Sequence, residues 1–485
     1  MRLITEHAGG PGGNRRARTA WPRAAFGGGL ALVAGLLAAV ACEHRTAPPN
    51  IVLYVVDTLR YDAVQCNGND AIRTPAMDRL AQEGLRFARA YAAASWTRPS
   101  MASVLTGVYP NTHGAVGRTD PLRPGLPLLA SELRRLGYRT AAVYANPNIG
   151  RSFGFAEGFD DFVDLYPARY ANDPSVPQQQ VGTADHVVNR AIAWLERRPA
   201  TPFMLLVFTV DPHAPYEPPA PYNTLYDRDY SGTVDGSIKS TFGLLAAAKL
   251  GQQPAARDVR HLRALYDGEV AFNDAQLARL LDALDRMQLA RGTVFVVTSD
   301  HGEEFYEHGY GDHGHSLYEE LIHVPLVVRW PDHIAPGRAY ADAVQLIDLY
   351  PTLLHIAGGR APEGPGRDLL DLLLGRNAVG VPSMAYAEEH LDDHNLRAMI
   401  LDQRKLIIDA ARPEPLSFDL RVDAGERHSL PGPPSPDLLV AMDTITRHDP
   451  PQPLGSAQPI RREDLPESAR SAMDNLGYGD QANAR

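Results

Sequence analysis

The segment Ile51–Asp57, IVLYVVD, is an unbroken run of branched and aromatic apolar residues that ends in a carboxylate. Strands that are buried on both faces of a parallel sheet have this composition, because helices cover both of their sides. Open α/β sheets place their functional sites at the carboxyl ends of such strands. The segment therefore predicts a central strand that delivers Asp57 to the functional edge of a parallel sheet.

Similar apolar runs recur along the chain and alternate with helical patterns. We expect further strands at Thr140–Tyr144, Phe203–Val210, Thr293–Thr298 and Pro325–Arg329, and helices at Thr74–Gly84, Met101–Leu105, Leu128–Leu136, Ala184–Glu196 and about Arg260–Met287. This alternation is typical of a doubly wound α/β sheet flanked by helices.

Three of the expected strands end in polar residues. Asp57 follows the first strand, Asp211 and His213 follow FMLLVFTV, and Asp300 and His301 follow TVFVVTS. Parallel strands bring their carboxyl ends to one edge, so these side chains are expected to converge on one site.

A smaller unit is expected after residue 357. The Gly- and Pro-rich segment Gly358–Gly366 indicates a linker. Short apolar runs beyond it predict an antiparallel sheet with strands at Met384–Glu388, Ala398–Leu401, Lys405–Ile408 and Leu416–Leu420. The predicted domains are thus an α/β domain over 51–357 and an α+β subdomain over 358–485.

The first 41 residues have the pattern of a signal peptide. Five arginines precede the uncharged run Ala24–Ala41, which is short and rich in Ala and Gly for a membrane span. Ala39–Cys42 resembles a bacterial lipoprotein box, so we expect Cys42 to be lipidated and 42–50 to be a tether. The expected location is the periplasm or cell envelope; a simply secreted form and an N-terminal membrane anchor are the alternatives.

Composition excludes several classes of protein. The chain has 485 residues, of which 44% are hydrophobic and 22% charged, as in globular proteins of more than one domain. Its net charge of −11 would fall to about −15 without the basic first 41 residues, so nucleic acid is not an expected partner. Only Cys66 lies outside the signal region, which excludes a disulfide framework.

Two motifs identify a family. Ser95–Gly114 reads SWTRPSMASVLTGVYPNTHG and Val297–Phe305 reads VTSDHGEEF. With VVDTLRYD, DPHAPY, HGHSLYEELIHVPLVVRWP, IDLYPTLLHIAG and FDLRVDAGERHSL, they resemble the sulfatase-like hydrolases of the alkaline phosphatase superfamily over nearly all of Pro49–Tyr478. The resemblance implies an alkaline-phosphatase-like fold and a sulfuric or phosphoric ester hydrolase.

The nucleophile position departs from the family pattern. The family signature is Cys or Ser, then x-Pro-Ser-Arg, then Thr-Gly. Its frame is kept at Pro99, Ser100, Thr106 and Gly107, but the nucleophile is Thr97, and Met101 replaces the arginine. Threonine has a secondary hydroxyl whose oxidation gives a ketone, so the formylglycine of sulfatases is not expected here.

The resemblance also implies a metal site. Its ligands would be Asp57, Asp300, His301 and the Thr97 oxygen, whereas sulfatases commonly place a second aspartate at Thr58 and an asparagine at His301. An imidazole with two carboxylates favours one Zn²⁺ or Mn²⁺, with Ca²⁺ as the alternative. Without a metal, Asp57 and Asp300 would simply cap helices.

A second metal ion is a further alternative. Asp211 and His213 would bind it with one of His308, His313 or His315, although the Asp-Pro-His spacing argues against this arrangement.

The remaining predicted roles surround the transferred group. The metal would activate Thr97 as nucleophile. His213 would serve as general acid to the leaving group, and His315 would contact the anion. Arg60, Arg98 and Asp211 are candidates for substrate binding. The reason for the two arginines is that a guanidinium can hold two anion oxygens. For Arg98, a side chain that faces solvent is an equal alternative.

These features leave three functions open. The leading hypothesis is an exported, metal-dependent hydrolase of sulfate or phosphate esters of small molecules or glycans. A phosphodiesterase or phosphotransferase acting on envelope glycans or lipids is the second, although such transferases usually carry several membrane helices. A non-catalytic binding relative is the third, and it would contain no metal.

Overall fold

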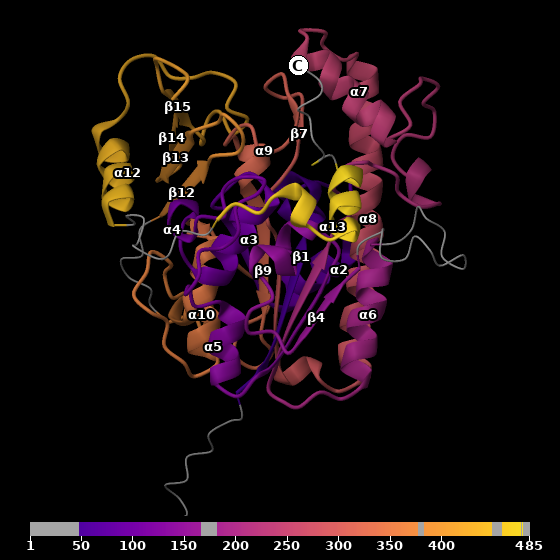
Figure 1. The fold of residues 1–485 in the computed structure, drawn as a ribbon, viewed down its shortest axis with the longest axis vertical. Helices are drawn as coiled ribbons and strands as arrows, with labels where there is room; N and C mark the ends of the chain where they lie inside the picture. The colour runs from indigo at the N-terminus through magenta and orange to yellow at the C-terminus, as the bar shows by residue number, and fades with distance from the viewer. Residues whose placement is uncertain (1–47, 166–181, 377–382, 449–457, 477, 479–485) are drawn as a thin grey trace, which may run out of the picture. The chain divides into compact units, whose positions relative to one another are not determined.

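The computed structural model describes residues 48–165, 182–376, 383–448, 458–476 and 478. At its centre lies a nine-stranded sheet with the order β10-β2-β9-β6-β1-β5-β3-β4, in which β11 also pairs with β2 (Figure 1). The strands are β1 Asn50–Val56, β2 Leu85–Tyr91, β3 Arg139–Tyr144, β4 Asp161–Asp164, β5 Phe203–Thr209, β6 Thr293–Ser299, β9 His323–Arg329, β10 Arg338–Tyr340 and β11 Val344–Gln345. The four strands predicted around β1 are all present.

Strand β1 shows why the apolar run is continuous. Ile51, Leu53 and Val55 pack into one hydrophobic core, and Val52, Tyr54 and Val56 pack into a second core on the other face. Helices α3 Thr97–Thr106, α5 Leu129–Arg135 and α10 Leu349–Ile356 contribute to the first core, and α2 Pro75–Glu83, α6 Ala184–Glu196 and α8 Ala256–Arg286 contribute to the second. Figure 1 shows these two helical layers on opposite sides of the sheet, which confirms the predicted α/β class.

The sheet is mixed rather than wholly parallel. Strand β9 pairs antiparallel with both β6 and β2, whereas β1 pairs parallel with β5 and β6. After β6 the chain forms β7 Glu304–Phe305, β8 Gly311–Asp312 and α9 Glu319–Ile322 before it enters β9 directly. Because no crossover returns the chain to the amino edge, β9 must run in the opposite direction.

The predicted antiparallel subdomain is present. Its sheet contains β12 Met384–Glu389, β13 Leu396–Leu401, β14 Arg404–Asp409 and β15 Leu416–Asp419 in sequence order. Helix α12, Pro436–His448, covers this sheet by packing Leu438 and Met442 against Met399 and Leu406.

The end of the described chain leaves this subdomain and returns to the α/β domain. Helix α13, Glu467–Asn475, buries Ala469, Ala472 and Met473 in the first core, and Ile460 N donates to Thr119 O. The prediction had placed this segment in the smaller unit. Its apolar face instead finds a partner on the domain that carries the sheet.

The remaining helices and turns complete the described fold. They are α4 Pro110–His113, α7 Ile238–Lys249, α11 Leu370–Leu373 and the 3₁₀ turns η1 Tyr61–Ala63, η2 Gln65–Asn67, η3 Pro147–Ile149, η4 Arg151–Phe153, η6 Tyr222–Thr224, η7 Ala290–Gly292, η8 Leu346–Asp348 and η9 Arg462–Asp464. Within the described residues, none of the helices has both the length and the apolar composition that a bilayer crossing needs. The predicted signal peptide and most of the predicted tether lie outside the described residues.

Candidate active site

The register of the two central strands places the predicted metal ligands together. Strands β1 and β6 run parallel with Val56 opposite Ser299, so Asp57 and Asp300 follow side by side at the same edge. Ligand atoms of Asp57, Asp300 and His301 all lie within 4.8 Å of one another. The convergence of these strand ends, predicted from the sequence, is what the structure shows.

Helix α3 presents Thr97 to this cluster. The helix begins at Thr97, and the Ser100 hydroxyl donates to Asp300 O at 2.6 Å, which ties the first turn to the end of β6. As a result, Thr97 Oγ1 lies 3.4 Å from His301 Nε2. A helix N-terminus favours negative charge at such a position.

The rest of the signature builds the helix rather than the chemistry. Gly107 closes α3 with a φ of 73°, and a Cβ atom there would lie 2.7 Å from the Tyr350 ring, so only glycine fits. Thr106 Oγ1 donates to Ala102 O within the last turn. Met101 is fully buried in the apolar core, so the family's arginine position faces away from solvent in this chain.

The three ligand residues fit a divalent cation. His301 Nδ1–H donates to Gly302 O at 2.9 Å, and burial lowers the pKa of His301 well below its ordinary value, so Nε2 keeps a free lone pair. Nε2 lies 3.4 Å from Asp300 Oδ2 and 3.7 Å from Asp57 Oδ1. Both carboxylate oxygens are buried without a hydrogen-bond partner, an arrangement that a metal ion would satisfy.

Asn146 is a site residue that the sequence analysis missed. Its Nδ2 donates to Asp57 Oδ2 at 2.6 Å and to Thr97 Oγ1 at 3.3 Å, so it links the carboxylate to the nucleophile position. Asn146 follows β3, which neighbours β5 in the sheet. The rule that identified the other strand ends would therefore have found this fourth one.

Two histidines meet a tyrosine beside Thr97. His213 Nε2 lies 2.9 Å and His313 Nε2 lies 3.0 Å from the Tyr478 hydroxyl, which is itself 3.4 Å from Thr97 Oγ1. The aromatic ring of Tyr478 also packs against Trp96. Tyr478 comes from the C-terminal segment and was not predicted.

The proton count of this cluster fixes the charge of one histidine. His213 Nδ1 faces Ala214 O at 2.6 Å, and His313 Nδ1 faces carboxylates of Glu303 and Asp312 at 3.0 and 2.9 Å, so both Nδ1 atoms carry hydrogen. A phenol donates one proton, whereas two Nε2 atoms face it. One Nε2 must therefore carry hydrogen as well, and its ring is an imidazolium.

The surroundings assign that charge to His313. Burial, with a smaller contribution from His313, lowers the pKa of His213 to about 3. Burial alone would lower the pKa of His313, but Tyr478, Asp312 and Glu303 outweigh it and hold this pKa well above its ordinary value. In this arrangement His313 Nε2–H donates a hydrogen bond to the phenol oxygen, and His213 Nε2 accepts a hydrogen bond from the phenol O–H.

Two other predicted residues have structural partners. His315 Nε2 contacts Glu304 Oε2 at 2.8 Å, so the structure brings His313 rather than His315 to the cluster. Asp211 Oδ2 accepts from Ala184 N at 2.6 Å and holds the start of α6. Asp211 and His213 thus have different partners, which gives no support to the second metal set.

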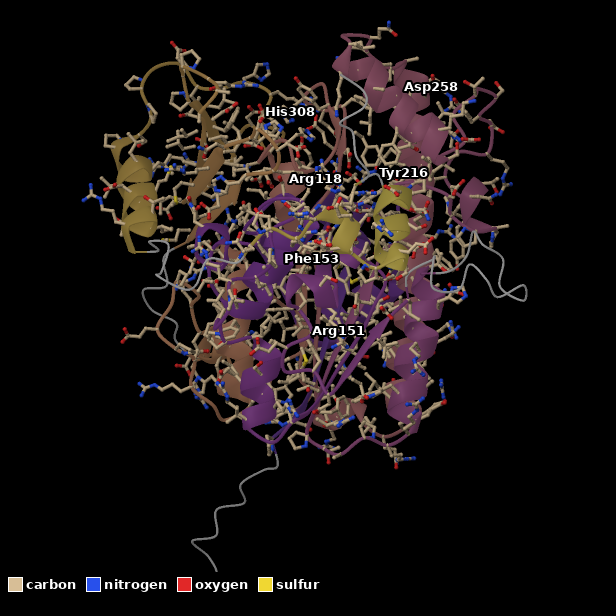
Figure 2. All side chains as sticks on the ribbon, viewed as in Figure 1. Arg118, Arg151, Phe153, Tyr216, Asp258 and His308 are labelled. Atoms are coloured by element: carbon tan, nitrogen blue, oxygen red, sulfur yellow. The ribbon has the colours of Figure 1, made fainter. Side chains whose placement is uncertain are left out.

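Both predicted anion-binding arginines bind protein groups. Arg60 donates to Asp62, to Glu303 O and to Glu307 Oε1. Arg98 donates to Gly117 O and to Asn148, and its guanidinium lies 3.5 Å from the centre of the ring of Phe153, labelled in Figure 2. Arg98 is fully buried, so the solvent-facing alternative is wrong, and both arginines instead support loops around the site.

Comparison with known proteins finds sulfatases. The family model described as "Sulfatase" matches residues 49–359, and the model "N-sulphoglucosamine sulphohydrolase, C-terminal" matches residues 306–432. An arylsulfatase from Clostridium perfringens is 27% identical over 442 residues, covering 79% of this chain and 90% of the relative. A mouse steryl-sulfatase is 29% identical, covering 71% of this chain and 69% of that protein.

A solved structure shows the same fold. The phosphonate monoester hydrolase of Agrobacterium radiobacter superposes with a TM-score of 0.68 and 23% identity, covering 82% of this chain and 94% of that protein.

Proposed function

The chain belongs to the sulfatase family of ester hydrolases, and from this premise we propose that it cleaves phosphate or sulfate esters with Thr97 as the nucleophile. One observation carries the proposal. The Thr97 hydroxyl, at the N-terminus of α3, lies within 3.4 Å of Asn146 Nδ2 and His301 Nε2, next to two buried carboxylate oxygens without partners. A hydroxyl in these surroundings is poised to carry negative charge.

Phosphorus esters fit this nucleophile better than sulfate esters. Formylglycine releases sulfate by elimination from its hydrated aldehyde, and Thr97 has no such route. A phosphothreonine can instead be discharged by in-line attack of water on phosphorus. We therefore place phosphomonoesters and phosphodiesters first and sulfate esters second.

The residues of the chain divide the work of the first step. Thr97 Oγ1 loses its proton to solvent, forms the new bond to phosphorus and displaces the ester oxygen. Asn146 orients Thr97 through its amide hydrogens. The proton for the departing oxygen comes from the His213–His313 pair, which faces the position next to Thr97 and holds one proton more than two neutral rings.

One divalent metal ion fits the same site. Asp57, Asp300, His301 and Thr97 would hold it, and Zn²⁺ or Mn²⁺ suits this donor set better than Ca²⁺. When bound, the ion supplies positive charge that stabilises the ionised hydroxyl and the ester oxygens.

We also propose an exported protein anchored at the cell envelope. The basic and apolar pattern of residues 1–41 and the lipoprotein-like ending at Cys42 support this location. Small-molecule or glycan esters would then be the accessible substrates. Substituting Cys42→Ser should release the protein from the membrane fraction of the producing cell, whereas unchanged fractionation would contradict the lipid anchor.

The test combines intact-protein mass spectrometry with metal analysis. The protein is mixed briefly with 4-nitrophenyl phosphate, bis(4-nitrophenyl) phosphate or 4-nitrophenyl sulfate. We expect a phosphate adduct that maps to Thr97, turnover of the phosphorus esters and about one metal ion per chain. Sulfate turnover alone would reverse the preferred substrate, and metal-free protein inert toward all three esters would refute the enzymatic proposal.

A further inference from the structure

The C-terminal segment reaches into the proposed active site. Helix α13 is anchored in the hydrophobic core, and two backbone contacts fix the residue beyond it: Tyr478 N donates to Met473 O at 2.8 Å, and Arg462 Nη1 donates to Tyr478 O at 3.3 Å. The Tyr478 ring is buried against Trp96, His213 and His313. The side chain therefore has a defined place rather than a loose one.

The phenol oxygen lies where the site would bind an ester oxygen. His213 Nε2 and His313 Nε2 both point at this oxygen. The oxygen also lies 3.4 Å from Thr97 Oγ1, the proposed nucleophile. Among the described residues, neither Nε2 atom has another hydrogen-bond partner. An ester oxygen that takes up these two groups must first displace the phenol.

We propose that Tyr478 is a built-in competitor of the substrate: its hydroxyl holds the oxygen-binding position closed until a tetrahedral oxyanion or its ester displaces it. This inference rests on the proposed function, because it assigns regulation to the same site. Tyr478 thus lowers the affinity of the site for weakly bound anions such as free phosphate. A substrate that displaces it must make additional contacts with the protein.

The size of the effect follows from the bonds that the phenol makes. The apparent affinity of a ligand falls in proportion to the open fraction of the protein. Two ordinary hydrogen bonds to imidazole nitrogens would favour the closed form by roughly 10- to 100-fold. Removing the whole side chain should strengthen anion binding by this factor, and removing the hydroxyl alone should strengthen it by less.

The experiment measures binding of inorganic phosphate by isothermal titration calorimetry, with the metal content of each sample determined. The variants are Tyr478→Ala and Tyr478→Phe, and the control is Tyr310→Ala, which removes an exposed tyrosine with no contact to Thr97 or His213. We expect phosphate to bind about 10- to 100-fold more tightly to Tyr478→Ala, and less strongly improved binding to Tyr478→Phe, whose ring still fills space. The control should bind like the wild type.

Three outcomes would overturn the proposal. Unchanged affinity in both Tyr478 variants would mean that the phenol does not compete. Weaker binding in both would make Tyr478 an anion ligand. Undetectable binding in both up to tens of millimolar phosphate would mean that the vacated position does not accept an oxyanion.

The result is separable from the proposed function. Tighter phosphate binding without turnover of any ester would support the competitor and refute the enzyme. Ester turnover with unchanged phosphate affinity would support the enzyme and refute the competitor. If Tyr478→Ala does not fold, as judged by its melting curve, the nearly isosteric Tyr478→Phe decides alone: any tightening supports the proposal, and unchanged or weaker binding refutes it.

Discussion

Replacing Lys405 with methionine should destabilise the protein by about 3–5 kcal/mol at pH 7.5. Lys405 on β14 is fully buried, and its Nζ donates to Glu319 Oε1 at 3.0 Å and to Glu426 Oε2 at 3.2 Å. Methionine fills similar volume without charge, so the change tests the ion pair rather than the packing.

Two carboxylates lose their partner. Burial raises the pKa of Glu426 to about 7 although Lys405 lowers it, so the magnitude is worked from Glu319, whose pKa is depressed. Burial would raise the pKa of Glu319, but Lys405 and His323 outweigh it and bring this pKa to about 2. Against an unfolded value near 4.3, the ionised group stabilises the folded chain by about 3 kcal/mol. Without the amine, most of this stabilisation is lost and a buried charge remains without a partner. The two effects together give the expected loss of about 3–5 kcal/mol.

The pH dependence has a definite sign. The wild-type contribution of Glu319 is fully present above pH ~4.3 and is lost as the pH falls toward 2, because the folded pKa is depressed. In the variant the uncompensated carboxyl takes up a proton more readily in the folded state. The difference between wild type and variant should therefore be largest at pH 7.5 and shrink toward pH 4.5.

The effect should extend to the proposed metal site. Glu319 begins α9, and the next two carbonyls of that helix, Glu320 O and Leu321 O, accept from Glu303 N and Gly302 N directly after His301. A loosened α9 should release bound metal at a lower chelator concentration.

Urea unfolding followed by circular dichroism at several pH values measures the stability change. The control is Arg447→Ala, since the Arg447–Asp443 pair is exposed and should contribute under about 0.5 kcal/mol. A loss below about 1 kcal/mol for Lys405→Met at pH 7.5, or a loss that grows on acidification, would refute the reasoning.

Three further predictions concern the site and its supports. Thr97→Val is nearly isosteric and removes only the hydroxyl, so kcat should fall at least about 10³-fold while the melting temperature changes little; more than a tenth of wild-type turnover would exclude Thr97 as nucleophile. Asn146→Leu removes the donor to Thr97 and should lower kcat by about 10²-fold in steady-state assays, and an unchanged kcat would leave Asn146 a purely structural role. Asp274 accepts from Ala76 N and Met77 N, and burial raises its pKa to about 7, so the stability that its protonated form provides is lost as pH rises from 4 to 7. Asp274→Asn should flatten that decline by up to about 4 kcal/mol in urea titrations across this range, and parallel pH curves for the two proteins would contradict this.

The amino-acid sequence alone determined the central strands of the sheet and the position of Asp57 and Asp300 at their carboxyl ends. Continuous apolar runs mark β1, β5 and β6, because a strand covered on both faces must be apolar at every position. Their parallel alignment then brings Asp57 and Asp300 together without any further information. The local apolar pattern and the direction of the strands were sufficient for this prediction, because a buried strand is recognised from consecutive residues of the chain.

Side-chain partners across the fold were decided only by the tertiary structure. His313 and His315 are two residues apart and equally placed in the sequence, but Glu303 and Asp312 flank one and Glu304 takes the other. Arg60 and Arg98 donate their hydrogen bonds to loop carbonyls and side chains of the protein. No local sequence pattern predicts these partners. Which polar groups remain free for a ligand depends on every packed neighbour.

Tyr478 shows the same limit most clearly. It contacts Thr97 across 381 positions of sequence, and only the packing of α13 against the core of the α/β domain brings it there. Helical periodicity predicts that such a segment has an apolar face, but not which surface covers that face. The sequence therefore determined the central strands and the edge of the sheet that carries Asp57 and Asp300, whereas the packing of the whole chain decided what stands in front of Thr97.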